Sequence, residues 1–131
     1  MYLNNHTYYS LRYGTLSPEQ LVELAAKQGL KKLVLTDINN TSGLYDFVQA
    51  CEKNNIKALA GIEFRKNNKL LYIGIARSNY GFHELCAFLS NINVFNNELP
   101  ERAPALNQTF FIYPWPNSFS SLRDDEFIGV Y

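Results

Sequence analysis

The chain has 131 residues with 47% hydrophobic and 15% aromatic side chains, and twelve basic and twelve acidic residues give it a formal net charge of zero. This length suits one domain with a sizeable core, and the apolar content excludes a mostly disordered chain. The charge balance gives no sign of a basic surface that would hold a nucleic-acid backbone. With no apolar leader and no run of membrane-spanning length, we predict a cytoplasmic protein without a membrane partner.

Apolar spacing and turn residues predict the elements of secondary structure. In chain order they are strand 1–5, helix 17–29, strand 31–37, a loop and helix over 38–55, strand 56–65, a hairpin turn over 66–69, strand 70–77, helix 78–93, strand 109–115 and strand 125–131. The β-α-β-α-β-β-α order over residues 1–93 predicts an α/β fold with a mostly parallel sheet. Residues 94–131 are predicted to add a connector and further strands to the same domain. Because the chain ends on an apolar strand, we expect a fragment of a longer chain.

The signals for a helix are clearest over residues 17–29. Ser17 is a good N-cap, and Gln20 three residues later completes a capping-box pattern. Gly29 is predicted to end the helix. The helical spacing predicts a buried stripe formed by Leu21, Leu24 and Ala25.

Polar side chains follow three predicted strands. His6 follows the first, Asp37 closes the second and Glu63 lies late in the third. Because sites form at the C-terminal ends of strands, these residues can converge on a metal ion or a phosphate, where a metal-bound water would hydrolyse an ester. The spacing leaves a second interpretation open. In it, Asp37 caps the following loop, Glu63 pairs with a lysine and His6 makes a local hydrogen bond.

A long block carries a family resemblance. Residues 6–64 read HTYYSLRYGTLSPEQLVELAAKQGLKKLVLTDINNTSGLYDFVQACEKNNIKALAGIEF, and YIGIAR and GFHELCAFLS follow. This order resembles the N-terminal PHP domain of bacterial DNA polymerase III alpha subunits, and the resemblance covers residues 2–91. It implies a PHP-type irregular (β/α) barrel, here partial or truncated. Active members hold a metal cluster at the strand ends and cleave phosphate esters, whereas in other members the site has decayed and the domain is a scaffold.

The match to the family's metal-binding motifs is partial. Of the opening His-x-His pair, His6 matches the second member, but Asn4 stands in place of the first. The Thr-Asp-His motif is matched by Thr36 and Asp37, whereas Ile38 replaces the histidine. An asparagine oxygen binds transition metals poorly, and isoleucine offers no ligand atom.

Two positions on the third and fourth strands complete the comparison with the family. Glu63 matches the bridging glutamate, but Leu71 falls where the family has a metal-binding histidine. The positions of the predicted vestigial metal site are Asn4, His6, Asp37, Ile38, Glu63 and Leu71. We expect no catalytic residue and no bound metal, with weak candidate ligands only at His6, Asp37 and Glu63. These three are expected to form a hydrogen-bond network with Asn4.

The resemblance also implies a parent protein and its partners. The parent would be a replicative DNA-directed DNA polymerase, a nucleotidyltransferase that binds DNA and uses Mg²⁺ outside this chain. For the chain itself we expect no cofactor, an inactive scaffold role in DNA replication, and contacts with the rest of the polymerase chain and a proofreading or other replisome subunit. Two alternatives stay open. One is a metal-dependent phosphoesterase or proofreading exonuclease, and the other is a module that stacks nucleobases on the aromatic run at residues 8–13.

Overall fold

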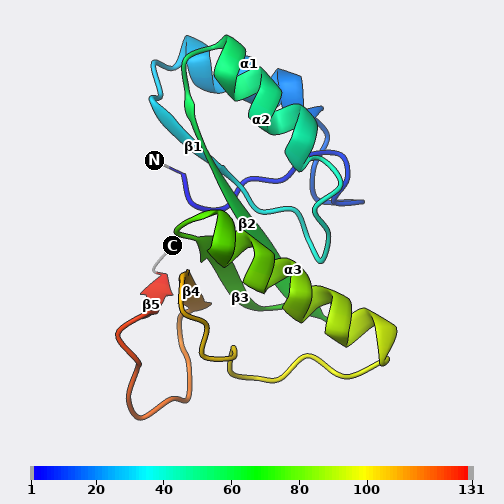
Figure 1. Ribbon diagram of the computed structural model, residues 1–131, viewed down its shortest axis with the longest axis vertical. Helices are drawn as coiled ribbons and strands as arrows, with labels where there is room; N and C mark the ends of the chain where they lie inside the picture. Colours follow the sequence, from blue (N-terminus) through cyan, green and yellow to red (C-terminus); the bar gives the residue numbers. More distant parts are fainter. Residues whose placement is uncertain (1, 130–131) are drawn as a thin grey trace.

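The computed structural model describes residues 2–129 and has an α/β fold, as the sequence predicts (Figure 1). The elements of this part of the chain are α1 (Pro18–Lys27), β1 (Lys32–Leu35), α2 (Leu44–Lys53), β2 (Lys57–Lys66), β3 (Lys69–Ala76), α3 (Asn79–Val94), β4 (Thr109–Pro114) and β5 (Glu126–Gly129). None of the helices in these residues is long and apolar enough to cross a membrane.

All five strands lie in one sheet, in the order β1-β2-β3-β4-β5. The sheet was expected to be mostly parallel, and its parallel pairs are β1/β2 and β4/β5 at the two ends. Between them, β3 runs antiparallel to both β2 and β4. Within residues 2–129 no pairing joins β1 to β5, so this part of the chain forms an open sheet and not a closed barrel.

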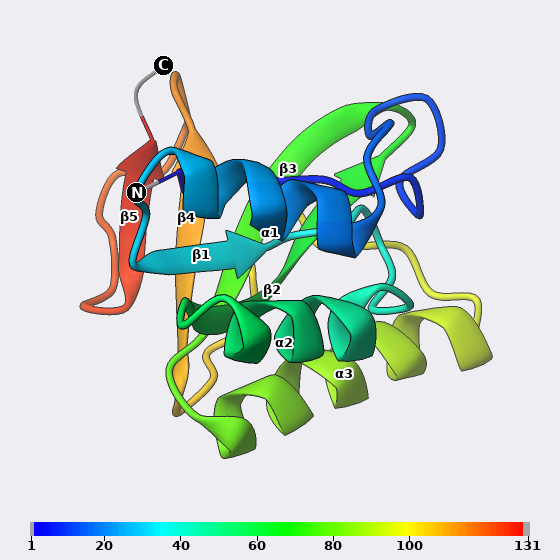
Figure 2. The same ribbon diagram turned by 90° about the horizontal axis from the view of Figure 1, so that it is seen from above.

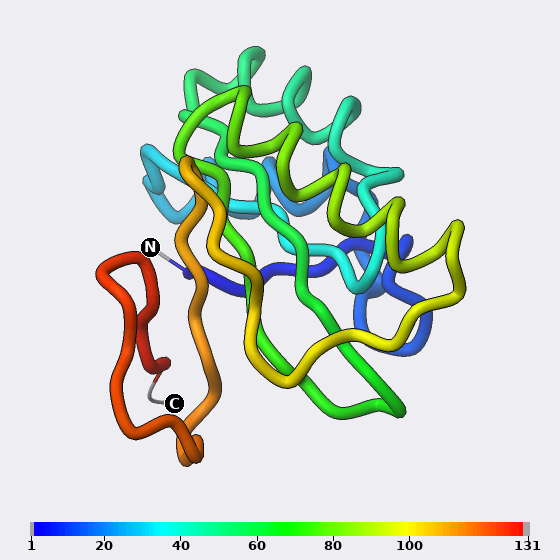
Figure 3. The backbone as a smooth tube through the Cα atoms, turned by 60° about the horizontal axis from the view of Figure 1, so that its bottom comes forward, coloured from blue at the N-terminus to red at the C-terminus, as the bar shows by residue number. Residues whose placement is uncertain are grey.

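The helices pack on the sheet in two groups. α1 and α2 pack with β1 around one apolar cluster, and Figure 2 shows both helices running alongside that strand. α3 packs with β2, β3 and β4 around a second cluster. The connector over residues 95–108 then returns along the sheet from the end of α3 to the start of β4 (Figure 3).

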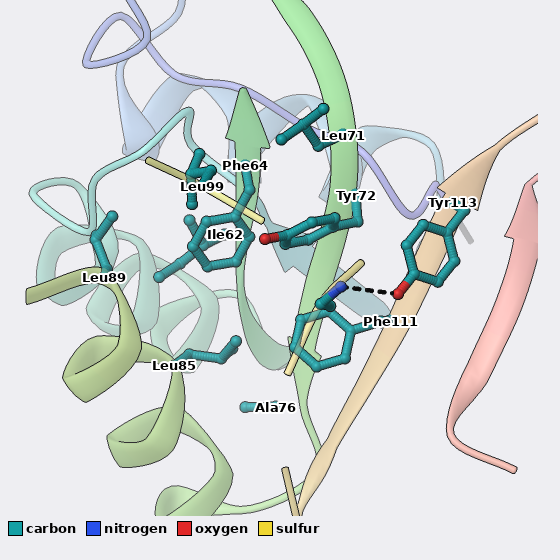
Figure 4. Close-up of a cluster of buried hydrophobic side chains, with 11 residues drawn as sticks. Ile62, Phe64, Leu71, Tyr72, Ala76, Leu85, Leu89, Leu99, Phe111 and Tyr113 are labelled. Atoms are coloured by element: carbon teal, nitrogen blue, oxygen red, sulfur yellow. Dashed lines mark hydrogen bonds between the residues drawn. The ribbon is translucent and has the colours of Figure 1, made fainter. Parts of the chain in front are cut away.

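The second cluster is aromatic and is centred on Tyr72 (Figure 4). The Tyr72 ring centroid lies 5.3 Å from that of Phe64 and 5.8 Å from that of Tyr113. The Tyr113 hydroxyl accepts a hydrogen bond from the Ala103 N–H at 3.0 Å and donates one to the Glu126 carboxylate at 2.8 Å. Through these two bonds, Tyr113 of β4 links the connector at Ala103 to the start of β5 at Glu126.

Glu126, at the start of β5, ties two loops together. Its carboxylate accepts hydrogen bonds from Arg102 Nε at 3.0 Å and from the Arg123 N–H at 2.8 Å. The Arg102 hydrogen bond contributes most to holding the pKa of Glu126 at about 2, against the opposing effect of burial. The carboxylate is therefore ionised over the neutral pH range, where it holds the two loops against β5.

The first predicted strand is wrong for the residues that the structure describes. Residues 2–6 form no strand, and Met1 lies outside the described residues. The Asn5 side chain donates to the carbonyl oxygens of Tyr2 and Val34, both at 2.9 Å, and the Asn5 N–H donates to the Thr36 hydroxyl at 3.0 Å. Side-chain hydrogen bonds thus compete with a strand ladder, and the segment passes beside β1 without joining the sheet. The last predicted strand begins at Glu126, and its residues 130–131 also lie outside the described part.

The capping signals of α1 are confirmed, but its predicted buried stripe is partly wrong. Ser17 and Gln20 form the capping box, and Gly29 follows the helix with a φ of 72°. The buried residues of α1 are Pro18, Val22 and Ala25. Residues 18, 22 and 25 follow each other at helical spacing, and this face of α1 packs against β1 and α2. Leu24 lies on another side of the helix and is 46% exposed.

The predicted turn over residues 66–69 joins β2 to β3. Asn67 and Asn68 have φ angles of 51° and 63°, as two-residue hairpin turns require and asparagine tolerates. The register of the hairpin shifts between Phe64 and Arg65. Such a bulge changes the direction of the neighbouring side chains, and this one lies directly beside the predicted site.

Candidate functional site

Three of the predicted site residues lie together on one side of β2. His6 Nε2 is 2.6 Å from Glu63 Oε2, and Asn4 Nδ2 donates to Glu63 Oε1 at 3.4 Å. The Thr36 hydroxyl donates to Asn4 Oδ1 at 2.9 Å and so fixes the Asn4 amide. The N-terminal segment and β2 therefore meet at the carboxylate of Glu63, which is fully buried.

Asp37 belongs to a separate group of hydrogen bonds. Its Oδ1 accepts hydrogen bonds from the Thr7 N–H and the Ser10 hydroxyl, and its Oδ2 accepts one from the Thr7 hydroxyl, all at 2.7 Å. Asp37 is buried, and both of its oxygens are directed at the loop over residues 7–10. Asp37 thus caps a loop, but this loop precedes it in the chain, whereas the sequence suggested the loop that follows.

Ile38 lies beside Glu63, whereas Leu71 does not. Ile38 forms a parallel bridge with Glu63, and its N–H donates to the Ser10 hydroxyl at 2.9 Å. Leu71 packs in the aromatic cluster under α3, while Leu70 packs with the apolar residues of the other sheet face. The register shift in the hairpin accounts for this placement, so Leu71 is not brought together with the other predicted positions.

Arg65 is a site residue that the sequence interpretation missed. Its Nη2 donates to Glu63 Oε1 at 3.1 Å, and its Nη1 donates to the Asn68 carbonyl oxygen at 3.3 Å. The Arg65 guanidinium carbon lies 4.3 Å from the centroid of the Tyr13 ring. A lysine was expected as the partner of Glu63. The available signal was the i, i+2 spacing, which places residues 63 and 65 on one face of a strand.

The charges around Glu63 determine its protonation. Burial would raise the pKa of the Glu63 carboxyl, but the hydrogen bonds and charges of His6 and Arg65 outweigh burial and hold the pKa below its usual value. The carboxylate is therefore ionised and paired at neutral pH.

A groove of about 410 Å³ opens beside this group. Its lining residues are Tyr9, Ser10, Leu11, Tyr13, Ile38, Asn39, Arg65, Asn67 and Asn68. Tyr8, Tyr9 and Tyr13 of the aromatic run are exposed. Among residues 2–129, no three or more His, Cys, Asp or Glu side chains are grouped in a way that could hold a metal ion.

Comparison with known proteins identifies a family. Residues 3–113 match the PHP domain. The chain is 40% identical over 91 residues to the DNA polymerase III subunit alpha of Mycoplasma genitalium, and 35% identical over 96 residues to that of Staphylococcus aureus strain MRSA252. These alignments cover 65% and 71% of this chain, but only 10% and 9% of the relatives. The chain thus spans about a tenth of the length of the curated relatives it matches.

Solved structures show the same fold. A putative metal-dependent phosphoesterase from Bifidobacterium adolescentis superposes with a TM-score of 0.53 at 24% identity, covering 70% of this chain and 32% of that one. An amidohydrolase from Chromobacterium violaceum, solved with bound sulfate and no metal, gives a TM-score of 0.55 at 25% identity, covering 71% and 33%. The resemblance stated for the sequence is confirmed, and the chain belongs to the PHP domain family.

Proposed function

We propose that this chain is the PHP domain of a bacterial replicative DNA polymerase of the polymerase III alpha type, and that it serves there as a scaffold without hydrolytic activity. The identity of 35–40% to two polymerase alpha subunits across the domain supports the first half of the proposal. The second half rests on the geometry around Glu63.

The observation that carries the scaffold role is the pairing of Glu63 with side chains of the chain itself. Arg65 and His6 approach its two carboxylate oxygens at 3.1 and 2.6 Å. The oxygens of Asp37 are engaged by the loop over residues 7–10. The residues present therefore do not fit the metal cluster that the family resemblance implies, because a transition metal needs several free imidazole, thiolate or carboxylate ligands.

The proposal includes the parent protein. Nucleotidyl transfer with Mg²⁺ and the binding of DNA belong to parts of the polymerase outside this chain. The partners of the domain are the rest of the polymerase chain and a proofreading or other replisome subunit, in the cytoplasm. The domain itself uses no cofactor.

Metal content and hydrolysis test the scaffold proposal. The purified chain is dialysed against Zn²⁺ or Mn²⁺ and then against metal-free buffer. Its metal content is measured by plasma mass spectrometry, and its activity on a generic phosphodiester is assayed with each metal. We expect clearly less than one ion per chain and no hydrolysis above the buffer rate.

The contrary result is equally clear. About one retained ion per chain, together with hydrolysis that His6→Ala abolishes, would contradict the scaffold role and support a metal-dependent phosphoesterase or exonuclease. The His6→Ala variant separates activity of this site from a contaminating phosphoesterase, because contamination does not respond to the substitution.

A further inference from the structure

We infer that the Arg65 guanidinium balances the negative charge of the Glu63 carboxylate, as a bound metal ion would in a metal-dependent PHP domain. The inference rests on the proposed function and deepens it, since it explains how this fold keeps a buried acidic side chain without a metal. The side chains around Glu63 do not fit the metal cluster that the family implies, because Arg65 and His6 already approach both of its carboxylate oxygens.

The buried carboxylate needs a positive partner. Glu63 is 0% exposed, and an ionised carboxylate in such a place is strongly unfavourable unless it is paired and hydrogen-bonded. The Asn4 amide, at 3.4 Å, brings no charge. His6 is charged only when it is protonated, whereas a guanidinium stays charged throughout the neutral pH range and well above it. Arg65 is therefore the permanent counter-charge of Glu63.

The position of the guanidinium is fixed from three sides. It donates to Glu63 Oε1 at 3.1 Å and to the Asn68 carbonyl oxygen at 3.3 Å, and it lies 4.3 Å from the centroid of the Tyr13 ring. These contacts link β2, the hairpin turn and the N-terminal loop. A side chain held in this way loses little further freedom when it pairs with the carboxylate.

The consequence for metal binding follows from the charge. A divalent cation that approaches Glu63 meets the positive guanidinium at one oxygen and the His6 ring at the other. Removal of the Arg65 charge would leave one carboxylate and one imidazole facing each other, which is a weak but real pair of zinc ligands. Arg65 thus stabilises the fold and excludes metal at the same time.

A double-mutant cycle with a zinc arm tests the inference. The midpoint of thermal unfolding, Tm, is measured for the full chain and for Glu63→Gln, Arg65→Met and the double variant, each with Zn²⁺ and with a chelator. Arg65→Met is expected to lower Tm by about 10 °C, because it leaves the buried Glu63 carboxylate without its positively charged partner. In the Glu63→Gln background the same substitution is expected to cost much less, because no charge is left unpaired.

The zinc arm separates a charge role from simple packing. Zinc is expected to raise the Tm of Arg65→Met and to leave that of the wild-type chain unchanged, since a ligand that binds only the folded state stabilises it. Arg65→Lys is the matched control. It keeps the charge, loses the fork-shaped donor group, and is expected to show a smaller fall in Tm and no response to zinc.

Additive losses in the cycle, or the same zinc response in wild type and Arg65→Met, would overturn the inference. If Arg65→Met does not fold, the cycle is run with Arg65→Gln, which also removes the charge, and additivity there overturns the inference as well. The proposed function is decided by the hydrolysis assay of the wild-type chain. Hydrolysis by the wild-type chain would therefore contradict the scaffold role. Additive Tm losses in a chain without hydrolytic activity would contradict only the role inferred for Arg65.

Discussion

Asp37 shows how one buried side chain can organise a loop that lies 30 residues away in the sequence. Its carboxylate accepts three hydrogen bonds at 2.7 Å from Thr7 and Ser10. Hydrogen bonds to a charged acceptor are stronger than those between neutral groups. Asp37, which the sequence suggested as a weak metal ligand, thus has a structural contact for each of its oxygens, and these contacts hold the loop over residues 7–10.

Asp37→Ala is expected to lower the free energy of unfolding by about 3 kcal/mol, because it leaves buried donors of Thr7 and Ser10 without an acceptor. Asp37→Asn is the matched control. It keeps the size and one acceptor oxygen, and it is expected to cost about 1 kcal/mol. Urea denaturation of the three proteins measures both values. Equal losses for the two variants would show that the acceptors at this position do not stabilise the loop.

At the scale of the elements, Gly81 in the first turn of α3 lies against Gln108, the residue before β4. A Cβ added at this position would lie 1.8 Å from the Gln108 carbonyl oxygen. The helix begins one turn earlier, with the Ser78 side chain as its N-cap. The first turn of α3 can therefore approach the backbone of the sheet only because residue 81 has no side chain, and this approach fixes where the helix lies over the aromatic cluster.

Gly81→Ala is expected to destabilise the chain by about 2 kcal/mol or more, because backbone must move to admit the methyl group. This sign is the opposite of helix propensity, which favours alanine over glycine by about 1 kcal/mol in an exposed helix. Ser90→Ala, at an exposed position of the same helix, is the control and is expected to change stability by about 0.5 kcal/mol at most. A gain in the urea midpoint for Gly81→Ala would contradict the close approach.

At the scale of the whole molecule, one sheet joins the region before residue 93 to the region after it. β4 pairs with β3, and it places Phe111 and Tyr113 in the aromatic cluster under α3. The connector adds Leu99 and Ala103 to the same cluster. Residues 2–93 and residues 94–129 therefore share the aromatic cluster as part of one core.

A chain shortened to residues 1–93 is expected to lose its fixed packing, because β3 loses β4, one of its two partner strands, and the aromatic cluster loses the residues of β4 and the connector. The measurable signs are binding of a hydrophobic dye and the absence of a cooperative urea transition. The full chain, measured in parallel, provides the reference. Cooperative unfolding of the short chain at the midpoint of the full chain would show that the first unit folds independently.

The sequence by itself determined the features that depend on neighbours a few residues away. The capping box at Ser17, the helix end at Gly29 and the turn at Asn67 and Asn68 each need only three or four residues to form. The family was also readable from the sequence, because its motifs keep their order and spacing even where single ligands are replaced.

The tertiary structure alone decided which groups meet at the site. His6 and Glu63 converge, Asp37 turns to the loop over residues 7–10, and Arg65 supplies the positive charge. The path of residues 2–6 beside β1 and the bulge that places Leu71 under α3 were likewise not readable from spacing. For His6, Asp37 and the path of residues 2–6, the physical reason is that the hydrogen bonds join segments far apart in the chain, and they form only once the sheet has set the distance between these segments. Arg65 and Leu71 depend instead on the register of the hairpin between β2 and β3, which the residue spacing alone does not fix.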